Sequence, residues 1–312
     1  MSEAPQAGGG LGVLWRLLRP RHWVKNVFVL APLIFARRTT DASAWLAAAG
    51  ALAGFCLLSS AVYIFNDIRD ADDDRRHPVK RLRPLASGEV GAVEAAMLAL
   101  VCLAVGLTAC VLVCWAVLVA GLCYVGLNVL YTLRLRRVMI VDVICIALGF
   151  VLRAMAGALA LSVPASGWLL VCTFTLCVFL GFVKRRYELA QLESAGLAGE
   201  GRAGPPYGLP LLDQFIAVSA GAAIVCYVLY TIDSRTVLNL RTDSLVLSIP
   251  PVVYCILRMI HLVRAGRFTD PTEVVTSDAP FVAALLLWAA IVAATATWGA
   301  QIEERLAGLI AA

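Results

Sequence analysis

The residues from Tyr63 to Glu89 hold six of the chain's 21 acidic side chains and six of its 26 basic ones. If the segment continues a preceding helix, Tyr63, Asn66, Asp70 and Asp74 follow one another at intervals of three and four residues and share one face. Carboxylates at that spacing would repel one another without a cation between them. Mg²⁺ is a hard cation that takes oxygen ligands and bridges to phosphates. The pattern NDxxDxxxD therefore predicts a ladder of oxygen ligands for Mg²⁺.

Basic residues follow this ladder in the stretch KRLRP. Lys80, Arg81 and Arg83 lie within ten residues of Asp74, where they can bind the remaining charge of a polyphosphate. The alternative is a solvated loop beside a membrane, whose charges only set the topology of the chain. The spacing of the carboxylates favours the polyphosphate site.

The chain as a whole is strongly apolar. Of its 312 residues, 61% are hydrophobic and 15% are charged, against roughly 45 to 50% apolar in soluble domains. Apolar stretches of about 20 residues recur and favour membrane-spanning helices over a barrel, whose strands would alternate in polarity. We therefore expect an integral membrane protein that has a lipid bilayer around it and no nucleic-acid partner.

The apolar runs predict an all-α polytopic membrane protein with about nine transmembrane helices. The expected spans are residues 24–36, 44–66, 91–112, 114–131, 139–161, 167–184, 211–232, 245–263 and 279–298. Residues 1–14 are predicted to form a disordered tail, 15–300 a single catalytic domain, and 301–312 a C-terminal tail. Because glycine and proline are frequent in the loop 186–210, we expect that loop to be irregular.

The distribution of basic residues predicts the orientation of the chain. A cytoplasmic N-terminus places most of them on one side, in residues 16–25, 67–90, 134–137, 184–202 and 264–267. An excess of Lys and Arg marks cytoplasmic loops. The prediction is a protein of the inner (cytoplasmic) membrane whose polar motifs all face the cytoplasm.

Further charges lie near or within the expected spans. Arg153 follows Asp142 by eleven residues, about three helical turns, and lies about 16 Å deeper. It either lines an interior cavity or is a structural arginine bonded to a neighbouring helix. Arg136 either marks topology or binds phosphate. Lys184 and Arg185 either capture the phosphate of a second substrate or form surface salt bridges.

These motifs together carry a resemblance. With NDxxDxxxD after the second apolar run and a second polar motif at 184–188, the chain resembles the UbiA superfamily of intramembrane prenyltransferases. Its members are helical rings around a central cavity that is open to the cytoplasmic side and binds a diphosphate through Mg²⁺. The aromatic prenyltransferases among them usually carry a second acidic motif, DxxxD, where this chain has KRRYE. Basic residues at that place suit a monophosphate.

A narrower resemblance follows from RPRHWVKN, NDIRDADDDRRHPVKRLRPLASG, LRAMAG and KRRYE. These stretches are similar to those of the decaprenyl-phosphate phosphoribosyltransferases. That family transfers 5-phosphoribose from 5-phosphoribosyl diphosphate (PRPP) to a polyprenyl phosphate, in the synthesis of precursors for cell-wall arabinan. The resemblance implies PRPP and a polyprenyl (decaprenyl) phosphate as substrates, and it leaves a homo-oligomer open.

The resemblance also implies roles for individual residues. Asn66 and Asp70 would hold Mg²⁺, and Asp67, Asp70 and Asp74 would be the carboxylates of the catalytic site. Lys184 and Arg185 would bind the lipid phosphate. PRPP would be bound by six residues, namely Lys25, Tyr63, Lys80, Arg83, Arg136 and Arg153. Two other functions stay open: prenyl transfer from a prenyl diphosphate to an aromatic or other acceptor, and anion transport.

Overall fold

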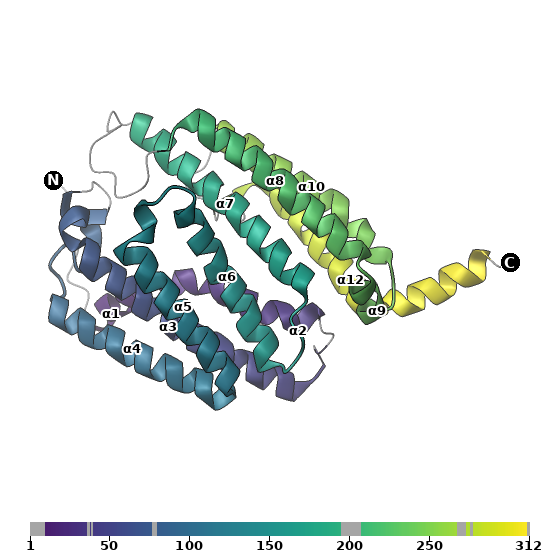
Figure 1. Cartoon of the computed structure of the whole chain (residues 1–312), viewed down its shortest axis with the longest axis horizontal. Coiled ribbons are helices and arrows are strands. Elements are labelled where there is room, and N and C mark those ends of the chain that lie inside the picture. The colour runs from purple at the N-terminus through teal and green to yellow at the C-terminus, as the bar shows by residue number, and fades with distance from the viewer. Residues whose placement is uncertain are drawn as a thin grey trace.

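The structure is a computed structural model, and it describes residues 10–35, 38, 40–76, 80–194, 207–266, 273–274 and 277–310. Every regular element in this described part of the chain is a helix (Figure 1). The elements are α1 (Gly10–Leu18), the 3₁₀ helix η1 (Pro20–Leu30), α2 (Ala31–Phe35), α3 (Ala42–Arg76), η2 (Lys80–Leu82), α4 (Ala92–Val113), α5 (Trp115–Leu133), η3 (Leu135–Arg137), α6 (Val141–Ala160), α7 (Gly167–Ser194), α8 (Leu209–Ile232), α9 (Ser234–Leu240), η4 (Ser244–Ser248), α10 (Ile249–Arg264) and α12 (Ala279–Ile310).

Eight helical segments of the described chain are long and apolar enough to cross a membrane. They correspond to eight of the nine expected spans, so the all-α polytopic fold is confirmed. The remaining stretch, 24–36, is divided between η1 and the short helix α2. Pro32 lacks the backbone donor that a continuous helix would need there, and the stretch has 13 residues, whereas a helix needs about 20 to span the bilayer.

Two helices extend well past the expected ends of their spans. Helix α3 has 35 residues and is roughly 52 Å long at 1.5 Å per residue, against a hydrocarbon core of about 30 Å. Its last turns carry the aspartates, so the predicted continuation of the helix through this segment is confirmed. Helix α7 continues to Ser194, so the prediction of irregular structure from residue 186 is wrong as far as that residue. The sequence RRYELAQLE consists mostly of good helix formers, and residues 195–206 lie outside the described chain.

The structure describes part of each predicted tail. Helix α1 begins at Gly10, so residues 10–14 are helical, and residues 1–9 lie outside the described chain. Helix α12 continues through residues 301–310, and Figure 1 shows this end projecting away from the other helices.

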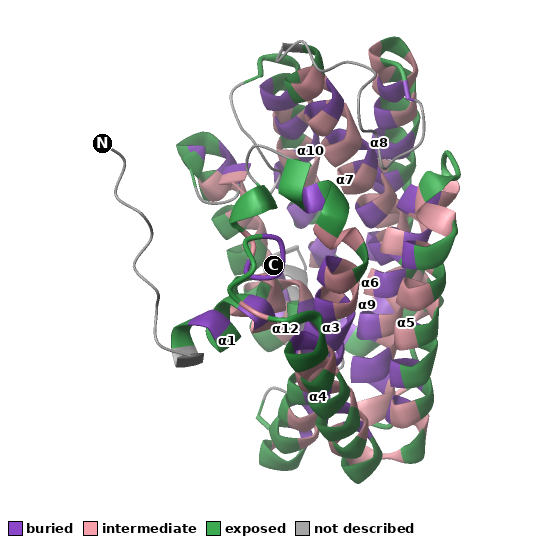
Figure 2. Cartoon of the chain, turned by 90° about the vertical axis from the view of Figure 1, so that its left-hand side faces the viewer, coloured by how far each residue is buried: buried purple, intermediate pink, exposed green. Residues whose placement is uncertain are grey.

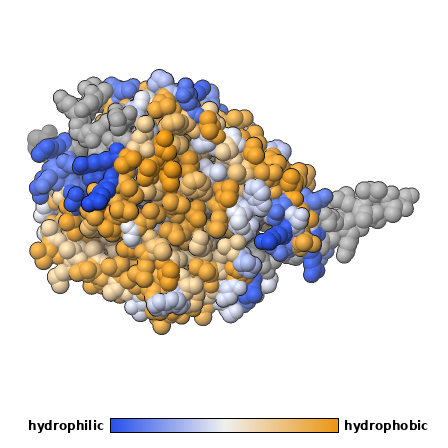
Figure 3. All heavy atoms as spheres, in the orientation of Figure 1, coloured by the Kyte–Doolittle hydropathy of each residue, from blue (hydrophilic) through white to orange (hydrophobic). Residues whose placement is uncertain are grey.

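Helices that follow one another in the sequence pack side by side, and α12 contacts α2, so the helices close on themselves. Buried residues line the inner faces, and the outward faces of helices such as α4 are exposed (Figure 2). Figure 3 shows a broad hydrophobic area over the middle of the molecule with hydrophilic residues at both ends. This distribution is the one expected of helices that cross a bilayer.

The 3₁₀ helix η1 packs closely against α6 at Gly157. A Cβ atom at this position would lie 1.9 Å from the carbonyl oxygen of Val29. Only glycine permits so close an approach of two backbones. The contact holds η1, and with it Lys25, against the inner helices.

Candidate active site

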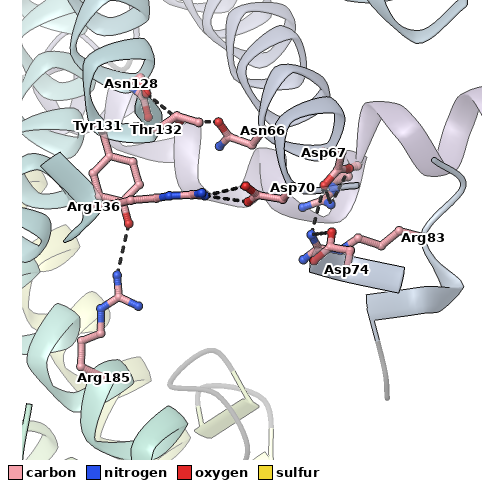
Figure 4. A network of polar contacts seen from close by, with 11 residues as sticks. Asn66, Asp67, Asp70, Asp74, Arg83, Asn128, Tyr131, Thr132, Arg136 and Arg185 are labelled. Atoms are coloured by element: carbon pink, nitrogen blue, oxygen red, sulfur yellow. Dashed lines mark hydrogen bonds and ion pairs between the residues drawn. The ribbon is translucent and has the colours of Figure 1, made fainter. Parts of the chain in front are cut away.

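The end of α3 presents Asn66 and Asp70 to the end of α5 and to η3 (Figure 4). The Asn66 amide oxygen accepts a hydrogen bond from the Thr132 hydroxyl. The Asp70 carboxylate accepts two from one nitrogen of Arg136, at 2.7 and 2.8 Å. Asn66 and Asp70 are four residues apart and share one face of α3, and their partners Thr132 and Arg136 lie on α5 and on η3, which follows it.

Asp67 and Asp74 lie together on a second face of α3. Seven residues turn a helix about 700°, or 20° short of two full turns. One nitrogen of Arg83 lies 3.1 Å from Asp67 and 2.6 Å from Asp74. Asp74, expected on the face of Asn66 and Asp70, thus shares its partner with Asp67. Both carboxylates are buried.

Two arginines attach the N-terminal segment to this region. Arg19 lies 2.5 and 2.6 Å from the two Asp67 oxygens, and its guanidinium carbon is 5.6 Å from the centre of the Tyr63 ring. Arg16 forms an ion pair with Glu89, and its hydrogen bond lowers the pKa of that carboxyl. Ion pairs therefore tie the N-terminal segment to the end of α3, through Arg19, and to the loop before α4, through Arg16 of α1.

The aspartates of α3 are compensated mainly by arginines. Asp67, Asp70 and Asp74 each pair with one or two of them, so their mutual repulsion is relieved without a metal ion. Among the described residues, no group of three or more His, Cys, Asp or Glu side chains is placed to hold a metal.

The oxygen atoms of Asn66 and Asp70 nevertheless fit Mg²⁺. This ion often takes only one or two protein carboxylates and fills its other positions with water and substrate phosphate. The Asn66 oxygen has two lone pairs and can keep its hydrogen bond from Thr132 while it faces an ion. These two residues would therefore hold Mg²⁺ together with a phosphate-bearing ligand.

A second polar cluster surrounds Arg185 on α7. Its guanidinium donates to Asp142 at 2.8 Å, to Glu188 at 2.7 Å and to the Tyr131 hydroxyl at 3.2 Å. The Tyr207 hydroxyl donates to the other Asp142 oxygen at 2.6 Å. Burial, together with this hydrogen bond to a carboxylate, raises the pKa of Tyr207. The cluster is thus a network of paired charges and hydroxyls.

The end of α5 joins the two clusters. Tyr131 contacts Arg185, and Arg136, five residues further on, contacts Asp70; Figure 4 shows both contacts at this end of the helices. Lys184 lies 3.9 Å from Glu188, and 45% of its side chain is exposed. The residues predicted to bind the lipid phosphate therefore lie at the same end of the bundle as the predicted magnesium ligands.

Arg153 lies deeper in the bundle and is buried. Its three guanidinium nitrogens donate to Asn26 at 2.7 Å, to the Gly149 carbonyl at 2.9 Å and to the Tyr124 hydroxyl at 2.8 Å. The guanidinium also lies over the rings of Tyr124 and Phe150. These contacts tie α6 to η1 and α5, which favours the structural reading of this arginine. Its contact with PRPP stays a prediction.

The other residues predicted to bind PRPP come from η1, from α3 and from the segment at η2. Lys25 is on η1, Tyr63 is one turn before Asn66, Lys80 begins η2, and Arg83 follows η2 directly. Arg83 forms ion pairs with Asp67 and Asp74.

Sequence reasoning missed several contributors to these clusters. Thr132 had a usable signal, because Asn128 and Thr132 are polar residues four apart on an apolar helix, and such residues usually face the bundle interior. Arg19 had none, because its partner Asp67 is 48 residues away in the sequence. The role of Tyr131 likewise depends on a contact with Arg185, which is 54 residues away in the sequence.

Comparison with known proteins places these features in context. The model of the UbiA prenyltransferase family matches residues 27–198. The decaprenyl-phosphate phosphoribosyltransferase of Corynebacterium glutamicum is 32% identical over 288 residues, which cover 88% of this chain and 83% of that protein. The enzyme of the same name from Mycolicibacterium smegmatis is 30% identical over 311 residues, covering 92% of this chain and 95% of that protein.

A solved structure bears on the fold. The UbiA homolog from Archaeoglobus fulgidus, bound to GPP and Mg²⁺, matches with a TM-score of 0.69 and 18% identity. The match covers 91% of this chain and 99% of that one. At this identity the likeness concerns the arrangement of the helices.

Proposed function

Since the chain belongs to the UbiA prenyltransferase family, and is thus a multi-pass membrane transferase, we propose that it transfers 5-phosphoribose from PRPP to a polyprenyl phosphate. The products would be decaprenylphosphoryl-β-D-5-phosphoribose, when the lipid is decaprenyl phosphate, and diphosphate. The reaction would take place at the cytoplasmic face of the inner membrane and serve the synthesis of arabinan precursors. Relatives that bear this activity in their names, similar over most of the chain, support the proposal.

One observation carries the choice of substrates: the second polar motif is cationic. Lys184 and Arg185 are neighbours on α7, and Figure 4 shows Arg185 at the same end of the bundle as Asn66 and Asp70. Arg185 is held by Tyr131 and two carboxylates, while Lys184 is nearly half exposed. An exposed lysine whose contact with Glu188 is as long as 3.9 Å can turn toward an incoming phosphate, which suits an acceptor that is itself an anion.

The transfer needs one bond to break and one to form. The bond from ribose C1 to the diphosphate oxygen breaks, and its electron pair leaves with the diphosphate. An oxygen of the lipid phosphate bonds to C1 from the opposite face, which inverts the configuration. That phosphate is already ionised at neutral pH, so no general base is required.

The chain's own residues would bind and orient the two anions. Arg136 and Lys80 would hold the diphosphate as its negative charge increases, and Lys184 would position the attacking phosphate. Mg²⁺, when bound at Asn66 and Asp70, would neutralise part of the charge on the leaving diphosphate.

An assay of substrate use tests the proposal. Purified protein is incubated with Mg²⁺, decaprenyl phosphate and PRPP labelled in the ribose, and in parallel with labelled geranyl diphosphate and an aromatic acceptor. Label from PRPP should move into the lipid fraction. Use of geranyl diphosphate alone would support the prenyltransferase alternative, and anion uptake into vesicles without any product would support a transporter.

Two variants on α3 make this assay specific to the site. Asp70→Asn should abolish turnover, because it removes the charged magnesium ligand. Asp72→Asn is the matched control, since Asp72 is exposed and forms an ion pair with Arg75 on the surface. Equal loss in both variants would contradict the assignment of Asp70.

A further inference from the structure

Asp70 and Arg136 form an ion pair across the candidate site. A single guanidinium nitrogen lies 2.7 and 2.8 Å from the two oxygens of the carboxylate. It therefore stands between the two oxygens, on the side where a cation shared by them would bind. The side chain of Arg136 is 15% exposed and that of Asp70 is 23% exposed, so water reaches the pair only in part.

The guanidinium and a magnesium ion cannot share this place. Both are cations, and at the same carboxylate edge they would repel each other. Asn66 differs, because its oxygen can keep the hydrogen bond from Thr132 and still bind an ion. Metal binding at this site therefore requires Arg136 to leave Asp70.

Arg136 needs another anion when it leaves. An unpaired charged group in a partly buried site is destabilising unless a new partner compensates its charge. A diphosphate supplies such a partner, since guanidinium binds phosphate oxygens well. The same diphosphate also completes the oxygen ligands of Mg²⁺.

We propose that Arg136 occupies the place of the cation on Asp70 until a diphosphate-bearing donor arrives, so that Mg²⁺ and donor bind tightly only together. This inference rests on the proposed function, in that it takes Asn66 and Asp70 as the magnesium ligands. Because coupling between two ligands is reciprocal, each should raise the affinity of the other by the same factor. Such factors are typically about 5- to 150-fold.

The other aspartates of α3 are unsuited to the same exchange. Asp67 is only 3% exposed and is bound by both Arg19 and Arg83. Arg83 also bridges to Asp74, so moving it would leave two buried carboxylates with too few partners. Asp70, paired with a single arginine at a more open position, is where an exchange disturbs least.

Calorimetric titration of the full-length protein in detergent tests the coupling without measuring turnover. In the unchanged protein, Mg²⁺ alone should bind weakly, and inorganic diphosphate or PRPP should tighten its binding at least fivefold. Arg136→Gln should bind Mg²⁺ alone roughly tenfold more tightly, and added diphosphate should then tighten Mg²⁺ binding by a clearly smaller factor than in the unchanged protein, because only the direct contact between diphosphate and Mg²⁺ still couples the two. A merely phosphate-binding Arg136 predicts no gain for Mg²⁺ alone.

Arg137→Gln is the matched control, because it removes the same charge from the next, exposed residue of η3. It should leave both affinities close to those of the unchanged protein. An equal gain from Arg137→Gln, or no gain from Arg136→Gln, would overturn the proposal, as would Mg²⁺ binding that is indifferent to diphosphate. Coupling with inorganic or geranyl diphosphate but not with PRPP would support the exchange and refute the proposed donor.

Discussion

Replacing Asp67 by asparagine tests whether this aspartate acts through structure or through chemistry. Its carboxylate is 3% exposed and lies between Arg19 and Arg83. Asparagine keeps the size of the side chain and removes its charge. Both arginines then lose an ionic partner in a region that water reaches poorly, so we expect the fold to be destabilised.

The magnitude follows from the burial of the partners. Removing one member of a buried ion pair costs about 3 to 5 kcal/mol. The side chains of Arg19 and Arg83 are 19% and 30% exposed, so water recovers part of the loss and about 3 kcal/mol is expected. At 2 °C or more per kcal/mol, this lowers the apparent Tm by about 6 °C.

The assay is the fraction of monodisperse protein that survives heating in detergent, read by size-exclusion chromatography. Asp72→Asn serves as the control on the same helix; a substitution at so exposed a position changes stability by less than about 0.5 kcal/mol. An Asp67→Asn protein with the unchanged Tm and no turnover would refute this reasoning. It would show that Asp67 belongs to the catalytic carboxylates, as the family resemblance implies.

Two further predictions concern the acceptor and the packing of η1. Lys184→Ala should raise KM for polyprenyl phosphate about tenfold and leave KM for PRPP unchanged, because a charged contact to phosphate contributes about 1.5 to 3 kcal/mol; steady-state kinetics with both constants unchanged would mean that the lysine only marks topology. Gly157→Ala should sharply reduce the yield of folded protein, since its Cβ would collide with the backbone of Val29, whereas Gly126→Ala, with no atom within 4 Å, should be tolerated. Equal yields on size-exclusion chromatography would contradict the close packing of η1.

Local patterns in the sequence were enough to predict most of the fold. Long apolar runs predicted the helices that cross the membrane, and the spacing of Asn66 and Asp70 predicted that they share a face at the end of α3. Both depend on residues near one another in the sequence. The stretch 24–36 was the exception. Its apolar composition led to the prediction of a membrane-spanning helix, although Pro32 and the short length of the stretch argue against one.

The pairing of charges could not be predicted in the same way. Arg136 and Asp70 are 66 residues apart, and Arg19 and Asp67 are 48 apart. Which arginine meets which aspartate depends on how α5, η3 and η1 pack against α3. For Arg153 the sequence left a cavity-lining and a structural role open, and its contacts with Asn26 and Tyr124 favour the second.

The continuity of α3 bears on how proteins of this architecture can diverge. One unbroken helix crosses the membrane and carries Asn66 and Asp70, so adding or removing a single residue upstream would turn both by about 100° and shift them 1.5 Å along the axis. Asn66 would then no longer face Thr132. The connection between Ala86 and Gly91 lies outside any helix and can change length without this effect. Homologous proteins are therefore expected to differ in α3 by substitutions, and to differ by insertions and deletions in the connections between helices.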